Sequence, residues 1–498
     1  MADSGAERTL CAWNTSAGRP ERADRLERRL VDQRETPLAD AAAAFLADPG
    51  IAPFTTPGHK RAPHLADDLL RLDLPLSSGA DDLHLRADVL GRAERLAAEL
   101  WGADACRFCV NGSTQGNQAL ALALGRPGDR VVVSRVLHKS VLAGLVLTGL
   151  DPVWVRPDVD AATGLPLALP PERVAAALRR APDACGTLLV EPSFVGVLSD
   201  LAAIAEVCHA AGAPLVVDQA WGAHLGFHPD LPPHALALGA DAFVTSAHKT
   251  LPAFTQGAYL LARAGRLDAA RLDEAFELLH TTSPSAAIMA SLDRARRLLA
   301  VRGEELLGET LRLAALFRER TAAVEGLTVV ASDDPTKLAL ALPGTGADGL
   351  AVEADLFAEG IRLELANRDL LVPLLTVGDT EESIERLADA LVRSLERRRD
   401  DPRAPGGASA VWAVAPEAAM TPREAFFAPR ETVRAEEADG RVAAETVAPY
   451  PPGIPAVAPG EVVSGELVEA LREAAAGGSR LAYCADPTLA TLQVVARP

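Results

Sequence analysis

Residues 242–250 read AFVTSAHKT, an apolar run of five residues with the character of a β-strand, followed closely by His248 and Lys249. In open sheets of parallel strands, ligands bind beyond the carboxyl ends of the strands. A lysine at such a place can form an imine with an aldehyde. A lone lysine at a strand end is more often a solvated surface residue, so its interpretation depends on the segments that accompany it.

Two segments upstream supply groups that complement this lysine. Asp218 ends an apolar run, where its carboxylate would be largely buried and would need a cationic partner. Further upstream, Gly112 lets the backbone come close to a ligand, and Ser113 and Thr114 offer hydroxyls and unpaired amides where a helix begins. An ordinary helix cap is the alternative explanation for each segment.

Pyridoxal phosphate requires an imine former, a partner for its ring nitrogen and a cradle for its phosphate. Lys249, Asp218 and the segment that starts at Gly112 supply these three groups. Burial and nearby positive charge would lower the pKa of Lys249, so that its neutral amine exchanges with a substrate. The hydroxyl of Ser246, three residues before the lysine, is in a position to reach the same phosphate.

Further side chains near these segments are candidates for the same site. His248 is well placed for proton transfer or for contact with a substrate carboxylate, and His138 follows another strand and would lie flat on the pyridine ring. A purely structural histidine is an equal competitor for both. Trp221 and His224 come just after Asp218 and are expected to line the pocket, with simple packing as the alternative.

Short apolar runs alternate with amphipathic helices through much of the chain. We expect strands at residues 130–134, 153–156, 187–191, 215–218 and 242–246. We expect helices at residues 83–100, 118–124, 171–180, 200–211 and 286–324. This order predicts an α/β fold, a mostly parallel sheet with helices on both faces.

The second part of the chain suggests smaller units. Strands at residues 328–331 and 337–342 and a helix at residues 380–397 predict a small α/β domain, and the Pro- and Gly-rich residues 401–410 read as a linker. The predicted organisation is a flexible extension over residues 1–34, a large cofactor-binding domain over 35–325, the small domain over 326–400 and a C-terminal domain over 411–498.

Composition limits the classes of partner. At 498 residues and 49% hydrophobic content, the chain can bury more than one core. The formal net charge of -19 disfavours nucleic acid and anionic membranes and favours a cationic small molecule. The six cysteines are scattered apart from Cys106 and Cys109, so we expect free thiols and no metal site. With no signal-like start and no run of about 18 apolar residues, we expect a cytoplasmic protein.

The chain resembles the bacterial Orn/Lys/Arg decarboxylases, which are pyridoxal-phosphate-dependent enzymes of fold type I. A series in order over most of the chain is far more specific than any single motif. The matching segments are residues 57–60 (PGHK), 81–84 (DDLH), 110–114 (VNGST), 138–140 (HKS), 217–218 (VD), 222–224 (GAH), 246–251 (SAHKTL), 255–256 (TQ), 280–284 (HTTSP), 449–455 (PYPPGIP) and 459–461 (PGE).

The resemblance also implies roles and an assembly. It implies a homodimer with shared active sites, in which Thr281 or Thr282 reaches the cofactor of the neighbouring subunit. The chain lacks the long amino-terminal wing domain of the inducible members, so large rings of dimers are not expected. The implied cofactor residues are Lys249 for the Schiff base, Asp218 for the ring nitrogen, His138 for stacking, and Ser113, Thr114 and Ser246 for the phosphate.

Three segments depart from the pattern of the family. Residues 219–221 read QAW, where an acidic residue and then Ala-His are frequent, and residues 191–194 read EPSF, where Pro-Thr-Tyr is usual. Residues 364–367 read ELAN in place of a segment that commonly ends in aspartate. These departures leave the cofactor groups intact and fall in the expected substrate pocket, so they bear on which side chain is accepted.

The activity that the resemblance implies is α-decarboxylation of arginine, lysine or ornithine, which yields CO2 and agmatine or a diamine. An aminotransferase or carbon-carbon lyase would keep Lys249 and Asp218 but normally needs an arginine clamp, and none is evident. A catalytically inactive regulator is the alternative outside enzymes. The distal cation of the substrate needs an acidic partner, for which the candidates are Glu364, Glu461, Asp81 and Asp82.

Overall fold

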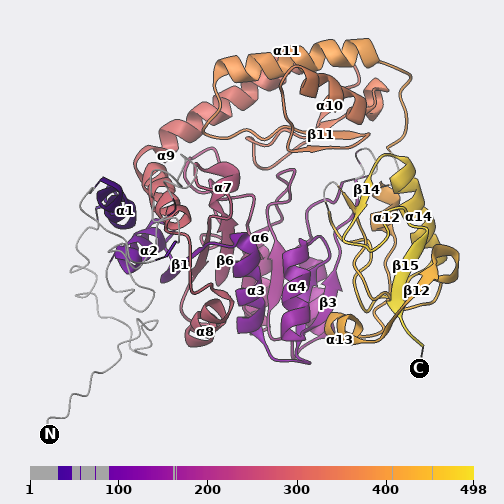
Figure 1. Ribbon diagram of the computed structural model, residues 1–498, viewed down its shortest axis with the longest axis horizontal. Helices are drawn as coiled ribbons and strands as arrows, with labels where there is room; N and C mark the ends of the chain where they lie inside the picture. The colour runs from indigo at the N-terminus through magenta and orange to yellow at the C-terminus, as the bar shows by residue number, and fades with distance from the viewer. Residues whose placement is uncertain are drawn as a thin grey trace, which may run out of the picture.

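The computed structural model describes residues 32–47, 56–57, 73, 89–160, 163, 165–405, 408–450 and 453–497. Most of the predicted N-terminal extension lies outside these residues, as do residues 58–60, 81–84 and 451–452 of the segments that carry the resemblance. The described chain forms a large domain around a seven-stranded sheet, a smaller domain reached through α9 (Ala286–Thr321), and a C-terminal domain beside the large sheet (Figure 1).

The large sheet has the strand order β1-β7-β6-β5-β4-β2-β3. The five strands from β6 to β3 run parallel to one another, whereas β7 is antiparallel to both of its neighbours. All five predicted strands are confirmed, β3 and β4 with slightly shifted ends. The strands are β1 (Ala105–Cys109), β2 (Arg130–Ser134), β3 (Asp151–Val155), β4 (Thr187–Val190), β5 (Leu215–Asp218), β6 (Ala242–Ser246) and β7 (Ala258–Ala262).

The two strands outside the predicted set form one edge of the sheet. In β1 the polar Arg107 interrupts the apolar run, and its Nε and Nη2 donate to Asp273 at 2.9 and 3.0 Å. The sequence of β7, AYLLA, is too short for its periodicity to separate a strand from a buried helix. Because β7 is antiparallel to both β1 and β6, β1 runs in the same direction as β6.

Helices cover both faces of this sheet, as predicted. Successive strand residues enter different cores: Val217 and Phe243 pack with α2, α5, α6 and α9, whereas Val216 and Val244 pack with α3, α4 and α8. The helices before α9 are α1 (Pro37–Ala47), α2 (Val89–Leu100), α3 (Gly112–Leu124), α4 (Lys139–Thr148), α5 (Pro171–Arg180), α6 (Leu201–Ala210), α7 (Ala247–Thr250) and α8 (Ala269–Leu279).

The small domain has its own antiparallel sheet, in the order β10-β11-β9-β8. Leu371 from this sheet, Leu391 from α11 and Phe317 from the last part of α9 share one core. The two predicted strands are present but shorter, and the predicted helix is α11. The elements are β8 (Thr328–Val329), β9 (Leu340–Ala341), η2 (Pro343–Thr345), α10 (Gly349–Ala358), β10 (Leu365–Ala366), β11 (Leu370–Val372) and α11 (Glu381–Arg398).

The C-terminal domain combines two two-stranded sheets with short helices. A hydrophobic cluster joins it to the other two domains through Ile454, Trp221 of the large domain and Leu365 of the small domain. No helix in the described ranges is both long and apolar enough to cross a membrane. The elements are α12 (Ala408–Ala413), α13 (Pro422–Phe427), β12 (Arg430–Arg434), η3 (Ala435–Glu437), β13 (Ala448–Tyr450), α14 (Gly465–Ala476), β14 (Arg480–Ala482) and β15 (Thr491–Val495).

Candidate active site

Segments that are far apart in the chain meet at one edge of the large sheet. Asp218 is the last residue of β5, and Ser246 is the last residue of its parallel neighbour β6. The short helix α7 follows β6 at once and carries Lys249. Because β1 runs parallel to β6, α3 also begins at this edge, at Gly112. The topology therefore gathers the predicted cofactor residues in one place.

The amine of Lys249 is partly buried against an aromatic wall. Its Nζ lies 3.9 Å from the centroid of the Trp221 ring. Burial lowers the pKa of Lys249 to about 8, against the opposing effect of the Asp218 carboxylate. The positive charge of Lys337 adds to the decrease, and Glu364 opposes it. A larger fraction of this amine is therefore neutral, and so nucleophilic, near pH 8 than for a solvated lysine.

Asp218 is almost completely buried, at 2% exposure. Its Oδ2 accepts a hydrogen bond of 2.6 Å from Asn117 Nδ2, and its Oδ1 accepts one of 3.1 Å from the backbone N–H of Ala220. Both donors are neutral, so the hydrogen bonds orient the carboxylate without balancing its charge. A buried carboxylate held in this way suits a cationic ligand atom.

His138 is linked to Asp218 through two polar side chains. Asn117 Nδ2 also donates to Ser140 Oγ at 2.9 Å, and Ser140 Oγ lies 2.8 Å from His138 Nδ1. The backbone N–H of Ser140 donates to the same Nδ1 at 3.3 Å, so Nδ1 acts as an acceptor. Desolvation by the surrounding protein lowers the pKa of His138, although the residue as a whole is exposed to solvent in this chain. His138 is therefore a neutral ring that is accessible for stacking.

The start of α3 has the features of an anion cradle. The first amides of a helix lack intrahelical partners, and the side chain of Asn111 makes no capping hydrogen bond to them. Gly112 has φ +66°, and a side chain added there would meet open space. The buried hydroxyls of Ser113 and Ser246 lie 2.7 Å apart, so the two segments predicted to bind one phosphate converge. Thr114 follows in the first turn and is half-buried.

A glycine sets how closely this helix approaches the sheet. A Cβ atom added to Gly116 of α3 would lie 2.4 Å from Val244 Cγ2 of β6. No real Cβ contact is that short, so any larger residue would push α3 away from β6. The close packing of α3 on β6 is what brings Ser113 within hydrogen-bond distance of Ser246.

His248 is half-buried and held by the backbone. Its Nδ1 lies 3.0 Å from the carbonyl oxygen of Gly257, an acceptor, so Nδ1 carries the proton in the neutral ring. Burial lowers the pKa of His248, with the Gly257 carbonyl opposing and Lys249 adding to the decrease. The arrangement leaves Nε2 of His248 for proton exchange.

His224 connects the large domain to the small one. Its Nε2 lies 2.9 Å from Asp334 Oδ2, and Thr336 Oγ1 donates to Asp334 Oδ1 at 2.7 Å. Asp334 is completely buried, and the neighbouring His224 and Lys337 hold the pKa of its carboxyl far below the usual range despite its burial. His224 thus has a positioning contact across the domain boundary.

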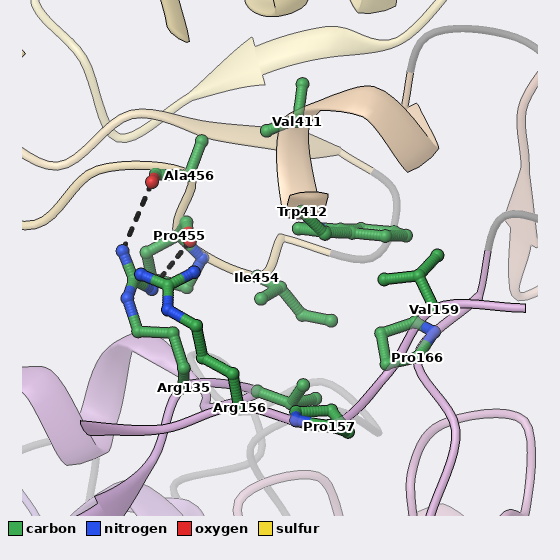
Figure 2. Close-up of a pocket in the computed structure, with 11 residues that line it drawn as sticks. Arg135, Arg156, Pro157, Val159, Pro166, Val411, Trp412, Ile454, Pro455 and Ala456 are labelled. Carbon is green, nitrogen blue, oxygen red and sulfur yellow. Dashed lines mark hydrogen bonds between the residues drawn. The ribbon is translucent and has the colours of Figure 1, made fainter. Parts of the chain in front are cut away.

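The prediction that Glu461 contacts the substrate does not fit the structure. Arg135 occupies both carboxylate oxygens of Glu461, with Nε 3.2 Å from Oε1 and Nη2 2.8 Å from Oε2. The same guanidinium donates to the carbonyl oxygens of Pro455 and Ala456, as Figure 2 shows. With 2% exposure, Glu461 joins the end of β2 to the C-terminal domain and is not free to bind a ligand.

The other acidic candidates and the predicted dimer residue have different places. Glu364 is exposed, just before β10 of the small domain, and its charge acts on the pKa of Lys249, His248 and Lys337. Glu364 therefore borders the site. Thr282 is exposed in this chain, beyond the end of α8. Asp81 and Asp82 lie outside the described residues.

Two residues that the sequence did not single out belong to this region. Asn117 joins Asp218 to Ser140, and Lys337 places its Nζ 5.2 Å from the centroid of the Trp221 ring. A signal for Asn117 exists, because it lies four residues after Ser113 and so on the same side of the helix. Lys337 could have been noticed from the composition of the chain, because only four of the 49 Lys and Arg residues are lysines and each of them therefore stands out.

One acidic residue at the edge of this region makes stability depend on pH. Burial raises the pKa of Glu191, just after β4, to about 7, and Asp333 adds to the increase. Because this folded-state pKa lies above the unfolded value, its stabilising contribution is full below about pH 4.5 and is lost as the pH rises to about 7.

We expect Glu191→Gln to flatten this pH dependence. The free energy of unfolding of the wild type should fall by up to about 3 kcal/mol more than that of the variant between about pH 5 and pH 8. Denaturant melts at both pH values measure the difference. Parallel pH profiles for the two proteins would contradict the assignment of a neutral buried acid to Glu191.

The residues at this edge fit pyridoxal phosphate. The hydroxyl pair and uncapped helix start suit a phosphate, the buried Asp218 suits a protonated ring nitrogen, and Lys249 offers a neutral amine. The exposed His138 suits contact with an aromatic ring. Among the residues that the structure describes, no cluster of three or more His, Cys, Asp or Glu side chains could hold a metal ion.

Known proteins match this fold and sequence over most of their length. The structure of lysine decarboxylase A from Pseudomonas aeruginosa has a TM-score of 0.78, with 22% identity, and the match covers 95% of this chain and 82% of that one. The arginine decarboxylase of Bacillus subtilis is 33% identical over 485 residues, covering 93% of this chain and 99% of the relative. The arginine decarboxylase of Halalkalibacterium halodurans is 34% identical, with 93% and 98% covered.

The fold and the site define an α/β protein whose candidate cofactor residues gather at one edge of a mostly parallel sheet. The profile of the Orn/Lys/Arg decarboxylase major domain matches residues 37–333, and that of the C-terminal domain matches residues 408–481. The chain belongs to the Orn/Lys/Arg decarboxylase family, which confirms the resemblance. It is accordingly a decarboxylase of a basic amino acid.

Proposed function

We propose that this protein uses pyridoxal phosphate to remove the α-carboxylate of a basic L-amino acid, with CO2 and an amine as products. The observation that supports this proposal most directly is the placement of Asp218 and Lys249. Both are buried for the most part, and they lie at or just beyond the ends of two neighbouring parallel strands. Arginine is the first substrate to test, because the relatives from Bacillus subtilis and Halalkalibacterium halodurans are named arginine decarboxylases. Lysine and ornithine are the other candidates.

Each residue has a distinct task in this proposal. When bound, the cofactor supplies an electron sink for the breaking bond between Cα and the carboxylate. Lys249 holds its aldehyde carbon, Asp218 keeps its ring nitrogen protonated, and Ser113, Thr114 and Ser246 hold its phosphate. His138 packs on the ring. His248, with Nδ1 fixed by the Gly257 carbonyl, delivers or accepts a proton through Nε2.

The proposal extends to the assembly and the compartment. Thr282 is exposed beyond α8, which supports a homodimer in which it reaches the neighbouring site. The five cysteines in the described residues are free thiols, which supports a reducing compartment such as the cytoplasm. The amine product is of the kind used in polyamine synthesis.

The experiment that tests the function is direct. The purified protein is incubated with pyridoxal phosphate and with arginine, lysine or ornithine, and the evolved CO2 and the amine formed are measured. Release of a keto acid without CO2 would favour an aminotransferase. Failure of all three amino acids while another is decarboxylated would overturn the substrate class and leave the cofactor residues in place.

Glu364 is the acidic side chain best placed to bind the distal cation of the substrate. We expect Glu364→Gln to raise KM for the basic amino acid by up to about 5-fold with little change in kcat, because the exposed carboxylate contributes binding equally before and during the reaction. The matched control is Glu353→Gln on α10 of the same domain. Equal KM values for both variants and the wild type would remove Glu364 from the pocket.

A further inference from the structure

Lys337 carries a buried amine that has no hydrogen-bond partner among the residues that the structure describes. The residue is only 4% exposed, and its Nζ makes no hydrogen bond within the described part of the chain. An ammonium group has three donors and no acceptor, and leaving buried donors unsatisfied costs free energy. A buried amine with unsatisfied donors is suited to bind a hydrogen-bond acceptor on a ligand.

The acidic neighbours of Lys337 do not satisfy its amine. Asp334 is engaged by His224 at Oδ2 and by the N–H and hydroxyl of Thr336 at Oδ1. Glu364 acts on Lys337 only through its charge, without a hydrogen bond, and is exposed to solvent. Burial lowers the pKa of Lys337, and both carboxylates oppose that decrease by favouring the charged form of its amine. Neither carboxylate takes its protons.

The amine of Lys337 faces the same wall as the reactive lysine. Its Nζ lies 5.2 Å from the centroid of the Trp221 ring, and Lys249 Nζ lies 3.9 Å from the same centroid. The charge of Lys337 contributes to the lowered pKa of Lys249. Two amines from different domains therefore lie near the same Trp221 ring and near enough for one charge to act on the other. Only Lys249 is assigned a task by the proposed function.

Packing fixes the stem of Lys337 in this direction. A Cβ atom added to Gly196, in the loop after β4, would lie 2.6 Å from Lys337 Cγ. Arg318 Nη2 donates to the carbonyl oxygen of Lys337 at 3.0 Å. The stem thus packs closely against the large domain, and the backbone of Lys337 is anchored by α9.

The choice of lysine at this position is also informative. The chain uses arginine for 45 of its 49 Lys and Arg residues, so a buried lysine at position 337 departs from its usual cation. A guanidinium would hold a carboxylate bidentately, whereas an ammonium is a compact point charge. A carboxylate that must leave as CO2 gains less ground-state stabilisation from the point charge, which favours the reaction.

From these observations, and on the basis of the proposed function, we infer that Lys337 binds the α-carboxylate of the amino-acid substrate. The α-amino group and the α-carboxylate of an amino acid are attached to the same carbon. When the amino group reaches the place of the Lys249 amine, the carboxylate must lie within a few ångströms of it. Lys337 supplies an unsatisfied cation there, from the small domain.

The test compares ligands with and without the carboxylate. The holoenzyme is titrated by calorimetry with the α-methyl derivatives of arginine, lysine and ornithine, and with the amines agmatine, cadaverine and putrescine. Lys337→Met should weaken binding of the carboxylate-bearing ligand about 10- to 100-fold, the loss of one hydrogen bond to a charged group. Binding of the corresponding amine should change less than about 3-fold.

Two variants serve as controls. Lys337→Arg retains the positive charge and should recover part of the lost affinity for the carboxylate-bearing ligand. Arg318→Met disturbs the same loop and leaves the Lys337 amine in place, so any effect should be equal for the amino acid and the amine. Weakening of both ligands to the same extent by Lys337→Met, or loss of the cofactor itself, would overturn the inference.

The outcomes separate this inference from the proposed function. Release of CO2 by the wild type reports on the function alone. If CO2 is released and Lys337→Met affects both ligands equally, only the inference fails. If the wild type binds a ligand pair without releasing CO2, the function fails and the comparison of the pair still decides the role of Lys337. If no pair binds, both fail.

Discussion

Replacing Lys249 by alanine should lower kcat/KM by at least about 1,000-fold, since removal of a covalently acting residue disables the groups that work with it. The amine at the end of β6 is the group with a pKa lowered to about 8 and a position beside Asp218. The measurements are CO2 release and intact mass after borohydride reduction of the holoenzyme, which makes the attachment of the cofactor permanent. The variant should show no added mass.

A second variant of Lys249 and the mapping of the attachment site control this prediction. Lys249→Arg retains the charge but offers no reactive amine, so it should be as inactive as the alanine variant. Peptide mapping of the reduced wild type should find the cofactor at Lys249. A cofactor mapped instead to Lys139 or Lys337 would refute the assignment on which the site depends.

The parallel part of the fold could be predicted from sequence because its strands are buried on both faces. Such strands read as short apolar runs between helices, and β2, β5 and β6 begin and end where that pattern predicts. Polar residues that directly follow them, such as Asp218 and Lys249, therefore reach the same edge of the sheet. The edge strand β1 and the antiparallel strand β7 did not show this pattern, since β1 contains Arg107 and β7 is too short to classify.

Long-range partners explain what the sequence could not supply. Glu461 looked available to a substrate, but the guanidinium that occupies it comes from a residue 326 positions earlier. Lys337 approaches Trp221 only because the small domain folds back over the large one through α9. The helical spacing from Ser113 could have indicated Asn117 as a site residue. Its hydrogen bond to Asp218, 101 residues away, could not be predicted because it depends on the packing of α3 on β6.

Asp218→Ala should nearly abolish turnover with the fold intact. Removing one partner of a buried ion pair costs about 3 to 5 kcal/mol, which corresponds to a loss of about 100- to 5,000-fold. The carboxylate is 2% exposed, and within the described ranges its hydrogen bonds come from two neutral donors, Asn117 Nδ2 and the N–H of Ala220. Its charge is therefore available to the ring nitrogen. Steady-state CO2 release measures the loss, and thermal melting checks that the fold persists.

The matched variants separate the charge of Asp218 from its hydrogen bonds. Asp218→Asn keeps the shape and an acceptor for Asn117 but removes the charge, so its activity should fall nearly as far as that of the alanine variant. Asn117→Ala removes one orienting hydrogen bond and retains the charge, so its loss should be smaller, about 10-fold. Activity of Asp218→Asn close to that of the wild type would mean that orientation rather than charge is the contribution of Asp218. The proposed pairing with a protonated ring would then be wrong.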